Sequence, residues 1–187
     1  MKFLIDGQKS RIDFRKLQWP DGIAGQLLTP LTGYKLASSV FAIDNGAFKR
    51  LESRKFSKLV ARYRSRNPLF VAIPDKVGCH KTTLRMYEEY RILGLGCRRA
   101  FVAQDGFDGY PEDASAIFIG GTNAFKDSIE AIELVNAAKK QGMHVHVGRV
   151  NGPDRFWRFH DAGADTCDGS GVSRYDHMLP IIRDARL

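Results

Sequence analysis

Val40-Phe41-Ala42-Ile43 is a short, wholly apolar run that stops at Asp44-Asn45-Gly46-Ala47-Phe48. A continuous apolar run of this length is typical of a strand that is buried on both faces of a parallel sheet. Because the run ends at a carboxylate followed by a glycine, Asp44 is predicted to begin a loop at the carboxyl end of the strand. In parallel α/β proteins, ligands and catalytic groups collect at that end of the sheet.

The same unit, an apolar strand with a polar or glycine-containing tip, recurs along the chain and is mostly followed by a helical segment. Strands are predicted at residues 40–43, 69–73, 100–103, 116–119, 144–147 and 164–167. Helices are predicted at residues 51–65, 81–93, 128–141, 155–162 and 178–186. The crossover between the strands at 100–103 and 116–119 is expected to be abbreviated, because it is too short for a full loop-helix-loop connection.

This alternation predicts an α/β fold with a parallel sheet. Six units with polar tips favour a compact or incomplete (β/α) barrel of the TIM type, because a full barrel typically needs about 200 to 250 residues and this chain has 187. An open doubly wound sheet is the alternative. Residues 1–187 are expected to form one domain, in which 1–40 are irregular and supply any remaining strands, and 40–174 carry the motifs.

The composition is that of an ordinary soluble globular chain, with 43% hydrophobic and 27% charged residues. No apolar run approaches the roughly 20 residues that cross a bilayer, so no membrane partner is expected. The three cysteines, Cys79, Cys97 and Cys167, are widely spaced and form no CxxC pair. They indicate neither a disulfide framework nor a zinc knuckle, and they fit a reducing cytoplasm.

The net charge of +8 and the isoelectric point near 9.5 point to an anionic partner. Basic residues gather in one segment, where a single acid, Glu52, accompanies Lys49, Arg50, Arg54, Lys55, Lys58, Arg62, Arg64 and Arg66. Such a segment attracts a polyanion through phosphate contacts and counterion release. A solvated helix face is the alternative interpretation.

The predicted strand tips place polar groups on one rim, in the order Asp44, Asp75, Gln104, Gly120-Gly121, Gly148-Arg149 and Asp168. Carboxylates and an amide oxygen suit Mg²⁺ or Mn²⁺, which would fit an enzyme acting on a phosphorylated metabolite. They also suit a flat heterocycle. Asp75 would accept two N–H groups of a guanine-like edge, and Gln104 with the Gly-Gly backbone would satisfy its carbonyl. Phe48 would stack on the ring or, alternatively, pack in the core.

Asp168 lies in the segment Gly163-Ala164-Asp165-Thr166-Cys167-Asp168-Gly169-Ser170-Gly171-Val172-Ser173-Arg174. A carboxylate at the end of a strand can act as nucleophile, general base or metal ligand. The simpler interpretation of Asp168 is an Asx-turn, since Asp and Gly are common turn residues. His144 and His146 are expected to point to opposite faces of their strand and so not to share a metal.

The order of these tips, over about residues 40–174, resembles the tRNA-guanine transglycosylase family, whose members exchange guanine for a 7-deazaguanine base. The segment 44–48 is similar to the family's Asp-Ser-Gly-Gly-aromatic segment, and Asp75 stands where the family reads the base. Gln104 and Gly120-Gly121 are similar to its strand-end glutamine and its glycine-containing substrate turn. Residues 163–168 match a Gly-x-Asp-x-x-Asp pattern that ends in the family's nucleophile, and Arg174 is the trailing arginine.

The resemblance implies a double displacement. Asp168 would attack the anomeric carbon and expel guanine, Asp44 would act as general acid and then base, and the incoming base would displace Asp168. The implied substrate-binding residues are Asp75, Gln104, Gly120, Gly121, Phe48 and Gly148. The expected nucleic-acid contacts are Arg149, Arg174, Lys49, Arg50, Arg54, Lys58 and Arg62. Structural salt bridges of Arg149 and Arg174 with Asp154 or Asp161 are the alternative.

The family's C-terminal zinc site, three cysteines and a histidine, has no counterpart in this sequence. The chain is therefore similar to the short, zinc-less branch, borne by phages and bacteria, that places 7-deazaguanines in DNA. DNA is the expected substrate, with tRNA as the alternative, and the target base would be flipped out of its stack. No cofactor or metal is expected, only the 7-deazaguanine base as co-substrate. The resemblance also admits an accessory ATPase and a homodimer, and, for a phage protein, the host cytoplasm. A non-catalytic nucleic-acid or nucleobase-binding barrel is the alternative from another class.

Overall fold

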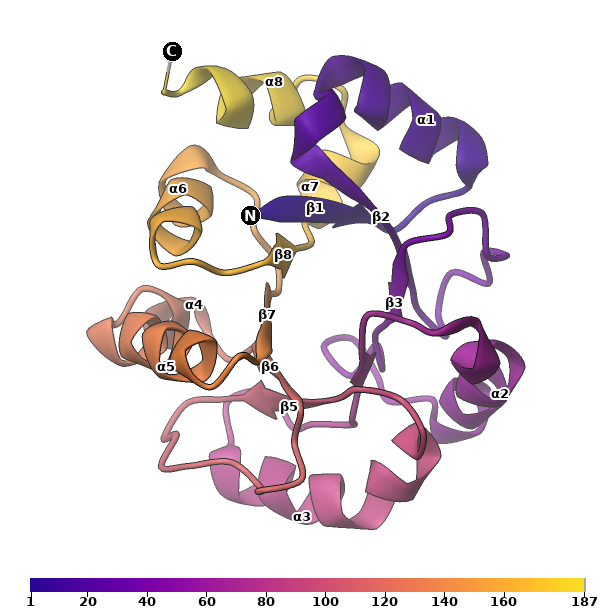
Figure 1. The fold of residues 1–187 in the computed structure, drawn as a ribbon, viewed down its shortest axis with the longest axis vertical. Helices are drawn as coiled ribbons and strands as arrows, with labels where there is room; N and C mark the ends of the chain where they lie inside the picture. Colours follow the sequence, from indigo (N-terminus) through magenta and orange to yellow (C-terminus); the bar gives the residue numbers. More distant parts are fainter. Residues whose placement is uncertain (187) are drawn as a thin grey trace.

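Eight parallel strands, each paired with its neighbours in sequence order, close into a barrel in the computed structural model, which describes residues 1–186 (Figure 1). The strands are β1 (Lys2–Ile5), β2 (Ile23–Leu28), β3 (Phe41–Ile43), β4 (Val71–Ala72), β5 (Arg99–Ala103), β6 (Ala116–Ile119), β7 (His144–Val147) and β8 (Thr166–Cys167). The last strand pairs with the first, with Lys2 opposite Thr166 and Phe3 opposite Cys167. The TIM-type barrel is thus confirmed, and it is complete rather than incomplete.

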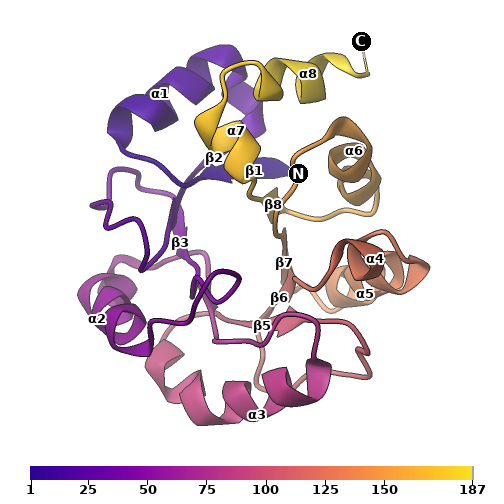
Figure 2. The ribbon, with the colours of Figure 1, turned by 180° about the vertical axis from the view of Figure 1, so that it is seen from behind.

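Helices surround the barrel, as Figure 1 and the view from the opposite end in Figure 2 show. They are α1 (Lys9–Gln18), α2 (Ser53–Tyr63), α3 (His80–Tyr90), α4 (Asn123–Lys126), α5 (Ile129–Lys140), α6 (Pro153–Asp161), α7 (Ser170–Arg174) and α8 (Met178–Asp184). Short 3₁₀ turns lie at Pro20–Gly22, Arg64–Arg66 and Arg91–Gly94. Among residues 1–186, no helix is long and apolar enough to cross a membrane.

The chain closes eight strands within 187 residues because two crossovers lack an α-helix. β5 passes to β6 through a helix-free loop, which confirms the abbreviated crossover expected there. β2 passes to β3 in the same way. The barrel is compact because these two crossovers contain no helix.

Residues 1–40 supply the remaining strands, as expected, because β1 and β2 lie there. The prediction that these residues are irregular is wrong, since they form β1, α1 and β2. Gly25 and Gln26 interrupt the apolar run of β2. Contacts with other parts of the fold explain why each residue stands there. A Cβ at Gly25 would lie 1.9 Å from the Val40 carbonyl oxygen, so only glycine lets β3 approach. Gln26 is fully buried, donates Nε2–H to the Gly7 and Lys35 carbonyls at 2.9 and 3.0 Å, and accepts the Ala37 N–H at 2.8 Å. Its side chain therefore holds the loop that leads to β3.

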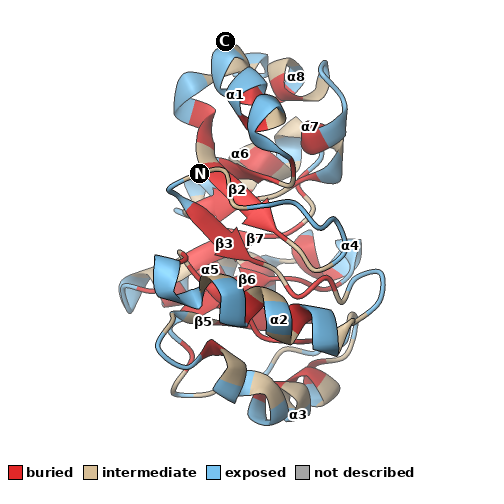
Figure 3. Ribbon diagram, turned by 90° about the vertical axis from the view of Figure 1, so that its right-hand side faces the viewer, coloured by how far each residue is buried: buried red, intermediate tan, exposed pale blue. Residues whose placement is uncertain are grey.

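The hydrophobic core has two layers, which explains why the strands read as continuous apolar runs. In β1, Leu4 belongs to the small cluster that fills the barrel, whereas Phe3 and Ile5 belong to the larger cluster between strands and helices. Large rings such as Phe70 and Phe118 fill the interior. Figure 3 shows the buried strands at the centre and exposed residues on the outer faces of the helices. The polar side chains at the strand ends are thereby left at the rim.

Candidate functional site

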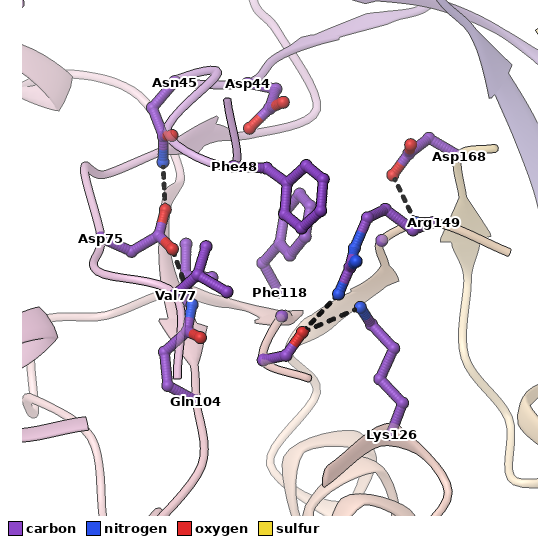
Figure 4. A pocket seen from close by; sticks show the side chains of 14 residues that line it. Asp44, Asn45, Phe48, Asp75, Val77, Gln104, Phe118, Lys126, Arg149 and Asp168 are labelled. Carbon is purple, nitrogen blue, oxygen red and sulfur yellow. Dashed lines mark hydrogen bonds between the residues drawn. The ribbon is translucent and has the colours of Figure 1, made fainter. Parts of the chain in front are cut away.

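One pocket opens at the carboxyl ends of the strands, the end of a (β/α) barrel where ligand sites are found. The structure brings together there nine of the predicted residues: Asp44, Phe48, Asp75, Gln104, Gly120, Gly121, Gly148, Arg149 and Asp168. Five further residues complete the lining: Asn45, Val77, Val102, Phe118 and Lys126. In Figure 4, Asp75 and Asp168 lie on opposite sides of the pocket, with Phe48 between them.

Asp75 is held by two amide side chains, one on each carboxylate oxygen. Asn45 donates Nδ2–H to Oδ1 at 2.9 Å, and Gln104 donates Nε2–H to Oδ2 at 2.6 Å (Figure 4). Burial raises the pKa of Asp75 to about 6, against the opposing effects of the Asn45 hydrogen bond and the Lys126 charge. Each carboxylate oxygen has a second lone pair, so the fixed carboxylate can still accept hydrogen bonds from a ligand.

Gln104 is itself fully buried, and both ends of its amide are engaged within the protein. Nε2 donates to Asp75, and Oε1 accepts the Gly78 N–H at 2.9 Å. Asn45 is engaged in the same manner, because Nδ2 also donates to the Ile73 carbonyl at 3.1 Å and Oδ1 accepts the Ala47 N–H at 2.6 Å. The contacts of both side chains therefore orient Asp75, and a direct contact of Gln104 with a ligand stays a prediction.

Asp44 follows β3 at the same rim. Burial raises the pKa of Asp44 to about 7, and the charges of Asp168 and then Asp75 add to the rise. Backbone N–H groups of Gly46 and Asn45 oppose it. A carboxyl whose pKa lies near neutral pH can both give and take a proton, which is the property that general acid–base chemistry requires.

Asp168 follows β8, and its carboxylate receives two hydrogen bonds on the same oxygen. His146 Nε2 and the Arg149 main-chain N–H both lie 3.2 Å from Oδ1. For Oδ2 no hydrogen bond is found within residues 1–186. The Asp168 side chain is 19% exposed and lines the pocket, so this second oxygen is the one available to a ligand.

The expectation that His144 and His146 point to opposite faces is wrong. Residues two apart along a strand share a face, and both rings reach the Thr166 hydroxyl, at 2.8 Å from His144 Nε2 and 2.9 Å from His146 Nδ1. Over the part of the chain that the structure describes, no three His, Cys, Asp or Glu side chains are grouped so that they could hold a metal ion.

Phe48 and Arg149 form the outer wall of the pocket. The Phe48 side chain is 58% exposed, so its core-packing alternative is wrong. The Arg149 guanidinium lies 4.0 Å from the centroid of the Phe48 ring, and its Nη2 donates to the Gly121 carbonyl. Neither Arg149 nor Arg174 forms the salt bridges considered for them with Asp154 or Asp161, and Asp161 pairs with Arg186 instead. Arg149 also has a φ of 59°, an uncommon value for a residue with a side chain.

Close approach explains two of the glycines. A Cβ at Gly148 would lie 2.5 Å from Cε1 of Phe118, and one at Gly121 would lie 2.7 Å from Cδ1 of Phe125. Gly121 in addition has a φ of 73°, in the left-handed region that favours glycine. These positions keep the pocket open and free its backbone for contact.

Lys126 is a pocket residue that the sequence did not reveal. Its side chain is 1% exposed and donates Nζ–H to the Gly121 carbonyl at 3.3 Å. Burial, and then the charge of Arg149, lower the pKa of Lys126 to about 7. The available signal was its spacing, because Lys126 comes one helical turn after Thr122, the N-cap of α4 at the strand tip.

The basic segment does not lie entirely beside the pocket. Lys49 lines a second depression, shared with Arg174, that joins the first through Asp44, Phe48, Arg149 and Asp168. Arg50 and Arg54 are exposed near the start of α2. Because α2 connects β3 to β4 it runs antiparallel to the strands, and its 11 residues extend about 16 Å at 1.5 Å per residue. Lys58 and Arg62 therefore lie progressively farther from the rim, towards the opposite end of the barrel.

No protein-family model matches the sequence, and no curated protein matches it significantly. Among solved structures, the chain is similar to a mutant tryptophan synthase alpha-subunit from the hyperthermophile Pyrococcus furiosus, with a TM-score of 0.54 and 12% identity, over 97% of this chain and 96% of that one. A cube-shaped, highly porous designed protein cage matches with a TM-score of 0.49 and 13% identity, over 98% of this chain and 70% of that one. A structure described as native KDPGal matches with a TM-score of 0.38 and 12% identity, over 99% and 92%. The similarity to the tryptophan synthase alpha-subunit supports the barrel fold, and at 12% identity it shows nothing beyond the fold.

Proposed function

We propose that this protein is a base-exchange transglycosylase that replaces guanine in DNA with a 7-deazaguanine derivative. The observation that carries the proposal is the pocket itself, which gathers Asp44, Asp75 and Asp168 from three separate strand ends. Each carboxyl has a different environment there, as a base-reading site with a nucleophile and an acid requires. The sequence resemblance assigns the same three roles.

In the proposed ground state, a guanine base lies in the pocket with its N–H edge at Asp75. The exposed Phe48 ring offers a stacking surface. Arg149 and Lys126 sit across the pocket from Asp75, where a carbonyl or other acceptor of the base would be favoured (Figure 4). This polarity, acceptors at one wall and donors at the other, suits a flat heterocycle that presents donors on one edge and an acceptor on the next.

The reaction proceeds in two displacements. Oδ2 of Asp168 attacks the anomeric carbon, the bond from that carbon to the base nitrogen breaks, and the electron pair leaves with guanine, which Asp44 protonates. The incoming base then attacks the same carbon through its ring nitrogen. The carbon–oxygen bond to Asp168 breaks, and Asp44 takes the proton of the attacking nitrogen, so that both carboxyl groups return to their starting states.

DNA is proposed as the polymer, with tRNA as the alternative. The net charge of +8 favours either polyanion. Lys49 and Arg174, which line the depression next to Asp168, would contact the phosphates on either side of a flipped nucleotide.

The test is an exchange assay. Duplex DNA, single-stranded DNA and tRNA, each carrying radiolabelled guanine, are incubated with the protein and excess unlabelled guanine or a 7-deazaguanine. Release of label from DNA that is lost in Asp168→Asn supports the proposal, and release only from tRNA corrects the substrate. If no polymer loses label, with or without an added ATP-driven helper, while guanine still binds in calorimetry, the protein is a nucleobase-binding barrel instead.

A further inference from the structure

A line of polar side chains crosses the interior of the barrel behind Asp168. His144 Nε2 lies 2.8 Å from Thr166 Oγ1, Thr166 Oγ1 lies 2.9 Å from His146 Nδ1, and His146 Nε2 lies 3.2 Å from Asp168 Oδ1. His146 is fully buried, Thr166 is 4% exposed, and His144 is largely buried. Barrel interiors are ordinarily filled by branched apolar residues, so three polar side chains in this layer need an explanation.

The hydrogen atoms of this line can be assigned from its ends. Burial lowers the pKa of His144 to about 4, so at neutral pH its ring carries one hydrogen. Placed on Nε2, this hydrogen is donated to Thr166 Oγ1, and the Thr166 hydroxyl donates in turn to Nδ1 of His146. His146 Nε2 in turn donates to the Asp168 carboxylate, which only accepts hydrogen bonds. Each of the three contacts along the line is thereby given one donor and one acceptor.

The His146 ring is also fixed by packing. Its centroid lies 4.6 Å from that of Phe118 and 5.0 Å from that of Phe70, and both rings belong to the interior cluster. The ring cannot turn away from Asp168 without displacing these neighbours, because the interior is close-packed. Its nitrogen is therefore a fixed donor aimed at one oxygen of the carboxylate.

We infer that His146 is a positioning residue for Asp168, set in its tautomer by Thr166 and His144. Together with the Arg149 main-chain N–H, it holds Oδ1 at 3.2 Å and leaves Oδ2, which has no hydrogen bond within residues 1–186, as the attacking oxygen. Because the carboxylate is already oriented, the entropy of selecting one rotamer does not add to the activation free energy, as it would for a freely rotating aspartate. The inference rests on the proposed function, since it assigns the oxygen that forms the glycosyl bond.

The first test needs no activity. The tautomer of His146 is read from the ¹⁵N resonances of its ring in the uniformly labelled, full-length protein at pH 7.5, with assignment by His146→Gln. The inference requires a hydrogen on Nε2, and resonances that move in Asp168→Asn but not in Asp154→Asn, an exposed carboxylate outside the line. A His146 Nε2 without hydrogen, or one indifferent to Asp168→Asn, would overturn it.

The second test is kinetic. His146→Leu removes the donor, whereas His146→Gln keeps an N–H close to the place of Nε2. The single-turnover rate of label release should fall about 10- to 100-fold in His146→Leu, as expected for the loss of one hydrogen bond to a charged group. It should be largely restored in His146→Gln, with KM for DNA unchanged in both. A raised KM at unchanged kcat, or equal losses in the two variants, contradicts a positioning role.

A second pair of variants, at Thr166, separates the loss of the hydrogen-bonded line from misfolding caused by a substitution at position 146. Thr166→Val keeps the volume and removes the hydroxyl, and Thr166→Ser keeps the hydroxyl. The rate should fall in Thr166→Val and be retained in Thr166→Ser, at matched thermal stability, and the opposite order overturns the inference. If the wild-type protein releases label from neither DNA nor tRNA, the proposed function fails, and the tautomer measurement alone then decides the contact between His146 and Asp168.

Discussion

Asp168 and Asp44 line one pocket from the ends of β8 and β3, and the charge of Asp168 is, after burial, the largest cause of the raised pKa of Asp44. Two carboxyl groups in one site cannot both ionise as readily as either would alone. The pair therefore separates into a carboxylate held by two donors and a carboxyl that titrates near neutral pH, which is how one site obtains a nucleophile and an acid.

The pH dependence of the reaction follows from this pair. Because Asp44 must hold a proton to release guanine, and its pKa is raised to about 7, kcat/KM for release should fall as the pH rises above that value. In Asp168→Asn the repelling charge is gone, so the pKa of Asp44 should drop, which carboxyl ¹³C titration by NMR would measure. An Asp44 titration that is unchanged in Asp168→Asn would contradict the coupling.

Asp44 should make the free energy of unfolding fall as the pH rises, whereas a carboxylate whose pKa is lowered by folding makes it rise. Its folded pKa is raised above its unfolded value near 4, so the native state loses stability as the pH rises from about 4 through 7. Asp44→Asn should therefore raise the free energy of unfolding at pH 8 by about 1–3 kcal/mol, with the gain vanishing towards pH 4. Urea denaturation at the two pH values provides the measurement, and an equal effect at both would refute the assignment.

Base binding should depend on the two amides that fix Asp75. Asn45→Ala removes one donor from the carboxylate and should weaken guanine binding about 10-fold, while Asp75→Asn should weaken it at least as much, since it replaces an acceptor by a donor. Isothermal titration with guanine tests both. Asp154→Asn, which changes an exposed carboxylate, is the matched control, and a weakening there equal to that in Asp75→Asn would show that charge alone matters.

Nucleic-acid affinity should depend on position along the basic segment. Arg54→Ala, near the start of α2, should weaken DNA binding and reduce the slope of log Kd against log salt by about 1. Arg62→Ala, on the same exposed helix but about two turns farther from the rim, removes the same charge and should have the smaller effect. Equal effects of the two variants would indicate non-specific attraction rather than a contact beside the pocket.

The glycine at the end of β7 should not tolerate a side chain. A Cβ at Gly148 would overlap the Phe118 ring at 2.5 Å, so Gly148→Ala should lower the free energy of unfolding by about 1–3 kcal/mol, as overpacking typically does. It should also lower guanine affinity, because Phe118 lines the pocket. Gly152→Ala, where a Cβ would meet nothing within 4 Å, is the control.

The sequence predicted the strands at residues 116–119 and 144–147 with their observed bounds. It did so because apolar runs bounded by turn residues are local features. The helix predicted at 128–141 was correct to within one residue at each end, because Ser128 caps α5 and Gly142, with a φ of 70°, follows it. The ends of the strands could be predicted in the same way, because a carboxylate that follows an apolar run is also a local feature of the sequence.

What the sequence could not reveal depends on barrel closure. Gly25 and Gln26 interrupt the apolar pattern of β2, and only the approach of β3 and the loop after β2 makes them suitable there. Asn45 and His146 are polar residues whose burial and partners come from other strands. Their roles in the site follow from contacts between segments far apart in sequence, which no local pattern encodes.

A covalent link between Asp168 and the sugar is the most direct consequence of this account. The protein is mixed with a guanine-containing single-stranded oligonucleotide without an incoming base, denatured, and separated on a gel, and the protein–DNA band is mapped by mass spectrometry. The account predicts a denaturant-resistant adduct on Asp168 that disappears on addition of a 7-deazaguanine and is absent in Asp168→Asn. An adduct that persists in Asp168→Asn, or turnover without any adduct, would contradict it.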